Sequence, residues 1–473
     1  MKRALAPALL IFAVALAFRA PGLADRPMHA DEAVLADKFG TLLEKGSYQY
    51  DPRDYHGPLL AWLTIIPAWV NGAHRYPDLT ETTLRVVPVL CGLILVLAPL
   101  LLVDTLGYWE AIASAGLTAV CPAMVYYSRY YIPEMLLMAL TFAVIVFGHR
   151  YGRTHKPGWA FAAGACLGLM FATKETAGIA AFCLVAAWLL TQRPLERPAW
   201  PVLAGLALAA LVPIVALGPA NITSAILNYS QRAIHEQVHR QPIYYYAGLL
   251  TWSPFICVLA AVGGVRARSP LMRFLAVYAC AMMLAYSAIP YKTPWCLLGI
   301  LQPMLVLAGA GLAGLLPTRD KFLYLVLAAS IGTLAIQTWQ ASFPYASDPG
   351  NPYVYGHTTR DVFEMRDAVE RIARANPDGQ DLTIQVVSAK NLWPLPWYLR
   401  GFRRVEWWPR IGPGFHPAAV IVATPDVEPG LIHEIYEAPP PGERELYVPL
   451  FDRYVELRPQ LEVRGYARAS LAR

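Results

Sequence analysis

Long apolar stretches separated by short polar segments dominate the first 340 residues of the chain. A helix needs about 20 mostly apolar residues to cross the hydrocarbon core of a membrane. Eleven stretches approach that length, at residues 4–20, 83–103, 108–127, 132–148, 158–174, 176–191, 199–218, 244–264, 271–289, 294–315 and 322–340. The pattern predicts an α-helical polytopic membrane protein with about eleven transmembrane helices. The first stretch also fits a cleaved signal peptide, but we favour an uncleaved anchor because an acidic motif follows closely.

After residue 340 the pattern changes to that of a water-soluble domain. Of the 72 Asp, Glu, Lys and Arg residues, 32 lie between residues 341 and 473. Thr359–Ala375 has helical spacing, and Leu382–Ser388 and Ala418–Ala423 are short β-branched runs between turn residues. We therefore expect a membrane domain at residues 1–340 and a small α/β domain at residues 341–473.

Composition excludes several classes of protein. The chain is 56% hydrophobic and 15% charged, whereas soluble domains carry roughly 25% charged residues. This excludes a soluble enzyme, a disordered chain and a nucleic-acid binder. The net charge of +6 needs no acidic partner, since membrane proteins collect Lys and Arg in their cytoplasmic loops.

The distribution of Lys and Arg also orients the chain in a cytoplasmic (inner) membrane. With the N-terminus inside, the inner connections carry most of the loop Lys and Arg residues. Eleven spans then place the first outer loop, about 21–81, and the tail outside the cytoplasm. Within that loop Glu32–Lys45 and Leu59–Val70 are predicted to be helices lying along the membrane surface, and Pro219–Gln241 forms a second amphipathic outer segment.

Five unusual polar clusters fall on this outer side. They are His29-Ala30-Asp31-Glu32, Tyr55-His56-Gly57-Pro58, Ser128-Arg129-Tyr130-Tyr131-Ile132-Pro133-Glu134, Thr173-Lys174-Glu175-Thr176 and Tyr291-Lys292-Thr293-Pro294-Trp295. Any one cluster fits a helix cap or a side chain reaching the headgroups. Five on one face indicate a single site, because ionisable residues at membrane depth are costly and usually functional. A carboxylate could deprotonate an attacking hydroxyl while Arg and Lys neutralise a phosphate leaving group.

The order of these motifs resembles the GT-C glycosyltransferase superfamily. The similarity covers roughly residues 1–340 and rests on the Asp31-Glu32 pair, the YHGP segment at 55–58 and SRYYIPE at 128–134. The branch it resembles is that of the protein O-mannosyltransferases and lipid A aminoarabinose transferases, with flippase-associated proteins of the YHGP type. Such a resemblance implies an enzyme that moves a sugar from a polyprenyl-phosphate carrier to an acceptor outside the cytoplasm. The acceptor is a protein, a lipid or a glycan.

The resemblance also implies roles for individual residues. Asp31 is similar to the catalytic base, Glu32 to its acceptor-side neighbour, and Glu134 to the acid of the second outer loop, which in some members helps to bind a divalent metal. Tyr55 and His56 occupy the first-loop motif. Relatives often carry Lys before the Pro, where this chain has Gly57. The candidate phosphate-binding residues, chosen by position, are Arg129, Lys174 and Lys292.

Asp31, His56 and Glu134 together are acceptable ligands for Mn²⁺, Mg²⁺ or Zn²⁺. The alternative for Glu134 is a simple ion pair with Arg129.

Other readings stay open at this stage. A lipid flippase or transporter is the main alternative, although transporters place their ionisable residues near the midplane. A structural scaffold would leave the acids and bases unexplained. Gly309–Gly314 matches GxGxxG but lies inside an apolar span, where it favours helix packing. The aromatic stretch Asn391–Arg400 suits either a stacked sugar or a seal against the membrane face.

Overall fold

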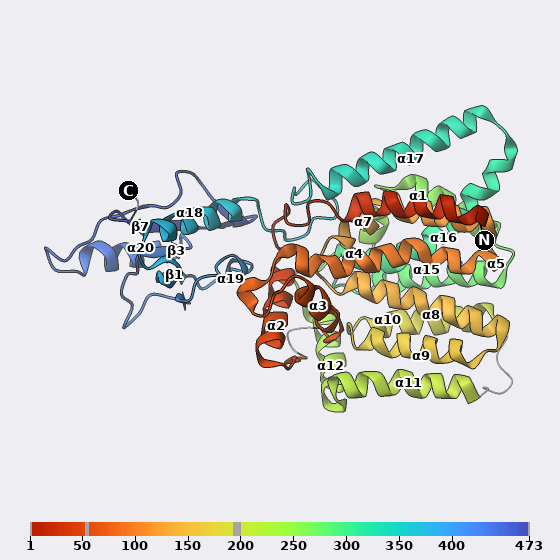
Figure 1. The fold of residues 1–473 in the computed structure, drawn as a ribbon, viewed down its shortest axis with the longest axis horizontal. Coiled ribbons are helices and arrows are strands. Elements are labelled where there is room, and N and C mark those ends of the chain that lie inside the picture. The colour runs from red at the N-terminus through yellow and green to blue at the C-terminus, as the bar shows by residue number, and fades with distance from the viewer. Residues whose placement is uncertain (1, 53–55, 193–199, 472–473) are drawn as a thin grey trace.

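A computed structural model describes residues 2–52, 56–192 and 200–471. Up to residue 342 the chain is helical, and its long helices run side by side in one bundle (Figure 1). These helices are α1 Lys2–Arg19, α4 Glu81–Leu97, α6 Tyr108–Val120, α7 Pro122–Ser128, α8 Glu134–Thr154, α9 Pro157–Phe171, α10 Ala177–Thr191, α11 Trp200–Leu217, α14 Pro254–Val265, α15 Pro270–Ala288, α16 Leu298–Leu315 and α17 Lys321–Ser342. A short helix, α5 Val103–Leu106, extends α4.

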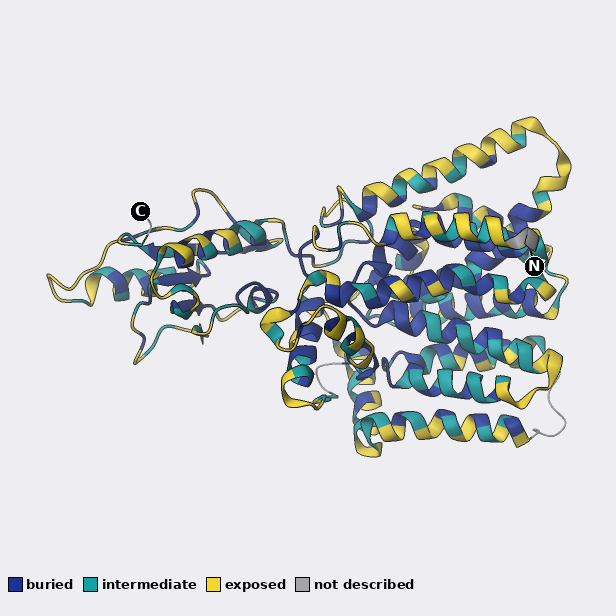
Figure 2. Cartoon of the chain, in the orientation of Figure 1, coloured by how far each residue is buried: buried dark blue, intermediate teal, exposed yellow. Residues whose placement is uncertain are grey.

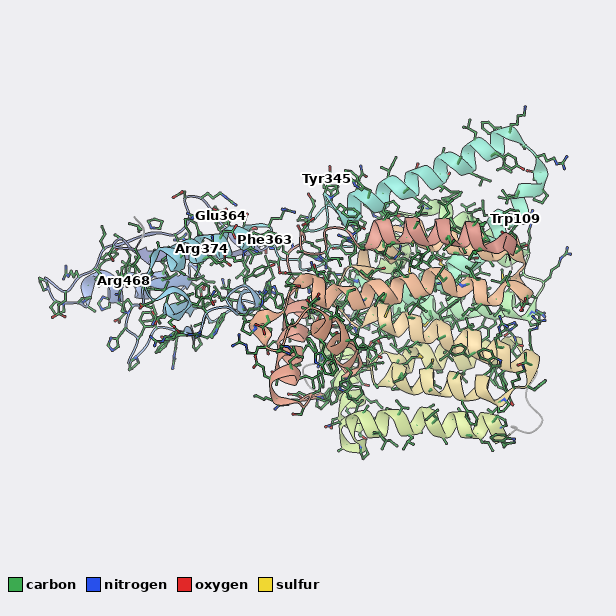
Figure 3. All side chains as sticks on the ribbon, in the orientation of Figure 1. Trp109, Tyr345, Phe363, Glu364, Arg374 and Arg468 are labelled. Atoms are coloured by element: carbon green, nitrogen blue, oxygen red, sulfur yellow. The ribbon has the colours of Figure 1, made fainter. Side chains whose placement is uncertain are left out.

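The outer surface of the bundle is apolar, as a lipid-facing surface must be. Figure 2 shows exposed residues along α11 and α17 at its edges. They include large apolar side chains such as Leu206, Val215, Phe322 and Leu325. Trp109 and Tyr345, labelled in Figure 3, lie at opposite ends of the bundle and are 59% and 50% exposed. Aromatic residues at both ends fit the two interfaces of a bilayer.

All eleven predicted stretches lie on helices, but their number as spans is not confirmed. Among the described residues, six helices are long and apolar enough to cross a membrane, or seven when the bent pair α6 and α7 is counted as one span. The others are shorter apolar helices such as α9 and α10.

Two stretches predicted as single helices are broken. The helices at either side of Cys121 are bent by 59°, and residues 244–264 form α13 Tyr245–Leu250 followed by α14. Pro122 and Pro254 begin the second halves, because proline has no N–H to donate to the preceding turn. The buried Arg19 guanidinium satisfies carbonyls freed at the first break, donating to Ala119 O at 2.9 Å and Thr118 O at 3.0 Å.

Three helices lie at the end of the bundle that faces the C-terminal part (Figure 1). They are α2 Ala30–Lys45, α3 Leu59–Val70 and α12 Pro219–His235. The first two coincide with the helices predicted at residues 32–45 and 59–70, and α12 lies within the segment 219–241, which was predicted to be amphipathic. Together they form a shelf between the bundle and the C-terminal domain.

The C-terminal part is a small α/β domain, as predicted. Its main sheet has the order β2-β1-β3-β7-β4, with β1 parallel to β2 and β3, and β7 antiparallel to β3 and β4. The strands are β1 Ile384–Val387, β2 Val405–Trp408, β3 Val420–Ala423, β4 Tyr447–Pro449 and β7 Arg464–Arg468, and β5 Glu456–Arg458 pairs with β6 Leu461–Glu462. The helices are α18 Asp361–Ala375, α19 Leu395–Tyr398 and α20 Glu428–Ile432. The apolar face of α18 packs into the core with β1 and β3.

Candidate active site

A cavity of about 380 Å³ lies where the helical bundle, its shelf and the C-terminal domain meet. All five predicted polar clusters contribute to its walls, and four predicted site residues line it, namely Asp31, His56, Glu134 and Lys174. The side chains that line it include Asp31, His56, Glu134, Lys174, Glu175, Tyr229, Arg232, Tyr355, Asn391 and Arg458. Segments far apart in the sequence therefore share one polar chamber. Tyr55 lies outside the described residues.

Asp31 stands at the start of α2, where the local sequence fixes it. The backbone N–H of Asp31 donates to His29 Nδ1 at 3.0 Å, and the backbone N–H of His29 donates to Glu32 Oε2 at 3.0 Å. This reciprocal cap holds the first turn of the helix. The Asp31 side chain is 55% exposed and lines the cavity, so its carboxylate is open to a ligand.

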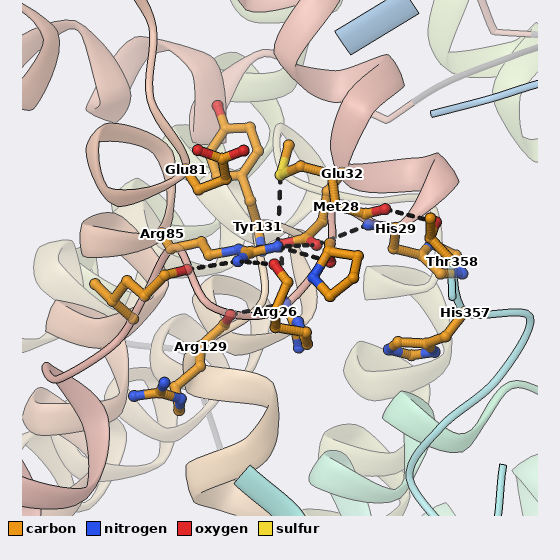
Figure 4. A network of polar contacts seen from close by, with 12 residues as sticks. Arg26, Met28, His29, Glu32, Glu81, Arg85, Arg129, Tyr131, His357 and Thr358 are labelled. Atoms are coloured by element: carbon orange, nitrogen blue, oxygen red, sulfur yellow. Dashed lines mark hydrogen bonds and ion pairs between the residues drawn. The ribbon is translucent and has the colours of Figure 1, made fainter. Parts of the chain in front are cut away.

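Glu32, the neighbour of Asp31, has a different position from the one predicted. Its side chain is fully buried and lies between two guanidinium groups, at 2.7 Å from Arg85 and 3.1 Å from Arg26 (Figure 4). It also accepts a hydrogen bond from the Tyr131 backbone at 2.7 Å. Burial alone would raise the pKa of this carboxyl, but the two arginines outweigh burial and hold the pKa well below its ordinary value. Glu32 therefore ties together the loops that carry the site and does not line the cavity.

The three predicted phosphate-binding cations are all occupied by protein groups. Arg129 lies outside the cavity lining and donates to the carbonyls of Arg19, Pro21 and Gly22. Lys292 is 2% exposed and donates to the carbonyls of Gln241 and Ile289. Arg129 and Lys292 therefore have a structural role, because the charged group of each donates hydrogen bonds to backbone carbonyl oxygens.

Lys174 is the one of the three that lines the cavity, and its ammonium contacts Glu134 Oε1. The ion pair between Glu134 and Arg129 that the sequence suggested is therefore not formed, and Glu134 pairs with Lys174 instead.

His56 lines the cavity beside a residue to which the sequence analysis gave no role. Its Nδ1 lies 2.8 Å from Glu175 Oε2, and the Tyr50 hydroxyl donates to Glu175 Oε1 at 3.3 Å. Burial alone would raise the pKa of Glu175, but the facing imidazole outweighs burial and lowers the pKa to about 2. Glu175 was visible in the polar cluster 173–176, although nothing in the sequence paired it with His56, 119 residues earlier.

The residues as they lie do not fit the predicted metal centre. Asp31, His56 and Glu134 all line the cavity, but an ammonium occupies Glu134 and a carboxylate faces His56. Within residues 2–52, 56–192 and 200–471, no three His, Cys, Asp or Glu side chains are close enough to hold one ion. We therefore derive no chemical step through a metal.

The C-terminal domain also contributes to the cavity. Asn391 and Arg458 line it, and the Arg458 guanidinium donates to the carbonyl of Asn391. Tyr355, in the segment that leads to this domain, accepts from His29 Nε2 through its carbonyl at 3.0 Å and contacts His239 Nδ1 through its hydroxyl at 2.6 Å. Asn391 begins the aromatic stretch that the sequence offered as a sugar-stacking candidate, whereas no sequence motif marked Tyr355 or Arg458 as part of the site.

Comparisons with known proteins agree with this architecture. A sequence profile described as dolichyl-phosphate-mannose-protein mannosyltransferase matches residues 55–217. ArnT from Cupriavidus metallidurans, solved bound to undecaprenyl phosphate, is similar in structure, with 18% identity and a TM-score of 0.65 over 98% of each chain. The chain has the GT-C fold.

Two larger GT-C proteins are also similar. The archaeal oligosaccharyltransferase AglB from Archaeoglobus fulgidus, in complex with an inhibitory peptide and a dolichol-phosphate, is 12% identical, with a TM-score of 0.61 over 90% of this chain and 69% of its own. The arabinofuranosyltransferase AftD from Mycobacteria is 15% identical, with a TM-score of 0.56 over 99% of this chain and 40% of its own. No curated protein sequence matches the chain. Profile and GT-C fold together indicate a membrane glycosyltransferase.

Proposed function

We propose that the protein transfers a sugar from a polyprenyl-phosphate donor to a hydroxyl group of an acceptor outside the cytoplasm. The observation that carries this proposal is a small, mainly apolar groove of about 30 Å³ that adjoins the polar cavity. The groove and the cavity share Glu134, Thr176, Trp295 and Cys296. The rest of the groove is lined by α8, α10, α15 and α16 with side chains such as Leu137, Ala180, Met282 and Leu298. An amphiphilic donor can place its headgroup in the cavity and the start of its apolar chain against this groove.

The ligands held by other GT-C proteins support this choice of donor. The ArnT structure contains undecaprenyl phosphate and the AglB structure contains a dolichol-phosphate. Both are polyprenyl carriers. One buried oxygen of Glu134 has no hydrogen-bond partner within the described residues, which leaves an acceptor for a sugar hydroxyl at the mouth of the groove.

In the proposed reaction Asp31 is the base. The acceptor hydroxyl loses its proton to the Asp31 carboxylate as its oxygen attacks the anomeric carbon, and the polyprenyl phosphate departs with the bonding electron pair. Lys174 and Arg232, which line the same cavity, supply positive charge for the phosphate. Asp31, with Arg458 and Asn391 near the C-terminal domain, forms the acceptor end of the chamber.

The test of this function is transfer by the purified protein in lipid bilayers. Labelled sugar is offered on undecaprenyl phosphate or on a nucleotide, with a cell-envelope extract as acceptor. We expect transfer from the lipid-linked donor alone. Asp31→Asn should reduce turnover by roughly 10²–10⁴-fold, because the amide cannot take a proton, while undecaprenyl phosphate still binds. Transfer from the nucleotide sugar with an inert lipid donor would disprove the proposal.

The orientation of the site in a cytoplasmic membrane is part of the same proposal. The N-terminus and the C-terminal domain lie at opposite ends of the bundle (Figure 1), which supports an outer position for the cavity when Lys- and Arg-rich loops face inward. In a cysteine-free background, Ser47→Cys and Glu443→Cys should react with a membrane-impermeant reagent in intact cells, and Thr154→Cys should react only after lysis. The reverse labelling pattern would place the cavity in the cytoplasm.

A further inference from the structure

Gly57 permits a close backbone approach that brings two parts of the cavity together. A Cβ atom at this position would lie 2.1 Å from the carbonyl oxygen of Ala172, so any other residue is excluded without movement of the backbone. The N–H of Gly57 donates to Thr173 O at 3.2 Å, and the N–H of Leu59 donates to Ala172 O at 3.3 Å. The YHGP segment is thus fastened to the turn between α9 and α10.

This contact places His56 beside Glu175 in a defined orientation. Because the Glu175 carboxylate accepts at 2.8 Å, Nδ1 of His56 carries a proton, and Nε2 is the atom through which the ring can exchange a proton with a ligand. The Tyr48 hydroxyl fixes the backbone by donating to His56 O at 3.0 Å, and Tyr50 holds the other oxygen of Glu175. The carboxylate of Glu175 therefore orients the His56 imidazole, and Tyr50 in turn holds that carboxylate in place.

The His56–Glu175 pair lies at the end of the cavity that adjoins the apolar groove, where the donor is proposed to bind. Glu175 stands between Lys174, which lines the cavity, and Thr176, which lines both the cavity and the apolar groove. The charged and titratable groups around His56 and Glu175 are Lys174 and Arg232 of the cavity wall and the hydroxyls of Tyr48, Tyr50 and Tyr229.

The polyprenyl phosphate that leaves during the proposed reaction gains a second negative charge inside the cavity. When the bond to the anomeric carbon breaks, the phosphate diester becomes a monoester whose second pKa is about 6. Lys174 and Arg232 of the cavity wall offset part of that charge, but Lys174 is already paired with Glu134, and Arg129 and Lys292 are held by carbonyls. A proton delivered to the phosphate would remove the extra charge.

We propose that His56 is the general acid of the reaction and that Glu175 is its positioning residue, so that His56 protonates the polyprenyl phosphate as it leaves. This rests on the proposed function. The carbon–oxygen bond to the phosphate breaks and its electron pair stays on the phosphate oxygen, which takes the proton from Nε2. The acceptor oxygen forms the new glycosidic bond and gives its proton to Asp31. Solvent then returns one proton to His56 and removes one from Asp31.

The first experiment changes the basicity of the leaving group. Full-length protein in lipid nanodiscs is given undecaprenyl phosphate mannose or the analogue with sulfur in place of a non-bridging phosphate oxygen, which leaves as a weaker base. His56→Asn should slow the phosphate donor by roughly 10²–10⁴-fold and the sulfur analogue much less. Asp31→Asn should slow both donors equally. Because the ratio of the two donors is measured within one protein, partial loss of folded material does not affect it. Equal slowing of both donors by His56→Asn would overturn the proposal.

The second experiment examines Glu175 through the pH dependence of turnover. An acid must be protonated, so activity should fall on the basic side with the titration of the imidazole. Glu175→Gln removes the negative charge that faces the ring and should move this basic limb to lower pH. A purely structural role of Glu175 would lower the rate at every pH without moving the limb, and that result would contradict its assignment. His74→Asn, an exposed histidine of the same loop, is the control that should leave the profile unchanged.

A third experiment measures the binding of the product, undecaprenyl phosphate, and needs no sugar donor. Its affinity for the wild type should fall more steeply above neutral pH than its affinity for His56→Asn, since only the wild type can lose the proton of His56. His74→Asn should behave as the wild type. If the two proteins differ in this pH dependence of binding but no sugar is transferred in any assay, the proposed function is refuted, whereas the contact between His56 and the phosphate is supported. Sugar transfer with identical pH dependence of binding in both proteins would refute the role of His56 alone.

Discussion

At the scale of single residues, the neighbours Asp31 and Glu32 show what a motif can and cannot predict. The pair marks the start of α2, and both carboxylates were assigned to catalysis from the sequence. One faces the cavity, whereas the other is fully buried between Arg26 and Arg85. Helical geometry turns consecutive side chains by about 100° around the axis, so adjacent residues of a helix seldom share a role. The sequence could not show which of the two carboxylates would be buried, because Arg85, which pairs with Glu32, lies 53 positions away.

The burial of Glu32 leads to a prediction about stability. Glu32→Gln removes the negative charge between two buried guanidiniums and should lower the free energy of unfolding by about 3–5 kcal/mol, since an uncompensated buried charge is costly. Thermal unfolding in detergent measures this change. Glu44→Gln, on the exposed side of the same helix, should have little effect. Equal stability of the Glu32→Gln variant and the wild type would mean that this network does not hold the first outer loop in place.

At the scale of elements, hydrophobic spacing predicted the helices well and their interruptions poorly. The surface helices α2 and α3 and the helix α18 appear within two residues of their predicted bounds, because amphipathic spacing is a local property. The breaks before Pro122 and Pro254 were missed. An apolar run does not reveal whether a neighbouring side chain, here Arg19, will donate hydrogen bonds to the carbonyls that a break before a proline leaves free.

Gly57 gives the sharpest prediction at this scale. Gly57→Ala should separate the YHGP segment from the turn after α9, because its methyl group would overlap Ala172 O. We expect a loss of about 1–3 kcal/mol in stability and a fall in transfer comparable to that of His56→Asn. Gly116→Ala is the matched control, since a methyl group there meets no atom within 4 Å, and it should be neutral or slightly stabilising. Full activity of Gly57→Ala would show that the close approach is not required.

At the scale of the whole molecule, the C-terminal domain is joined to the bundle by contacts that no local pattern could predict. The Tyr398 hydroxyl accepts from the Met28 backbone at 2.8 Å, the Trp397 indole donates to Glu81 at 2.8 Å, and Arg400 donates to Leu79 O at 2.7 Å. Composition distinguishes a charged tail from an apolar body, but it does not decide whether Asn391–Arg400 binds sugar or seals the membrane face. These contacts favour a docking role for that stretch. They also explain why Asn391 and Arg458 reach the cavity.

His357 makes this docking sensitive to acid. It is buried between the two parts, where its Nδ1 accepts from the Tyr355 backbone at 2.9 Å and its Nε2 lies 2.8 Å from the Tyr126 hydroxyl. Burial, with repulsion from His29 and Arg26, lowers the pKa of His357 well below its ordinary value of 6.5. The unfolded chain therefore binds a proton below pH 6.5 that the folded protein does not. Stability should fall as the pH drops below this value, by up to about 1.4 kcal/mol per pH unit.

The measurement is thermal unfolding between pH 7.5 and 5. His357→Gln cannot titrate, so its unfolding temperature should depend less on pH than that of the wild type, even though the variant is less stable at pH 7.5. His416→Gln, whose side chain is exposed, should retain the dependence of the wild type. If all three proteins lose stability in parallel, the acid sensitivity arises from other groups and His357 is only a packing residue. If His357→Gln alone is insensitive, this one buried imidazole accounts for the loss of stability in acid.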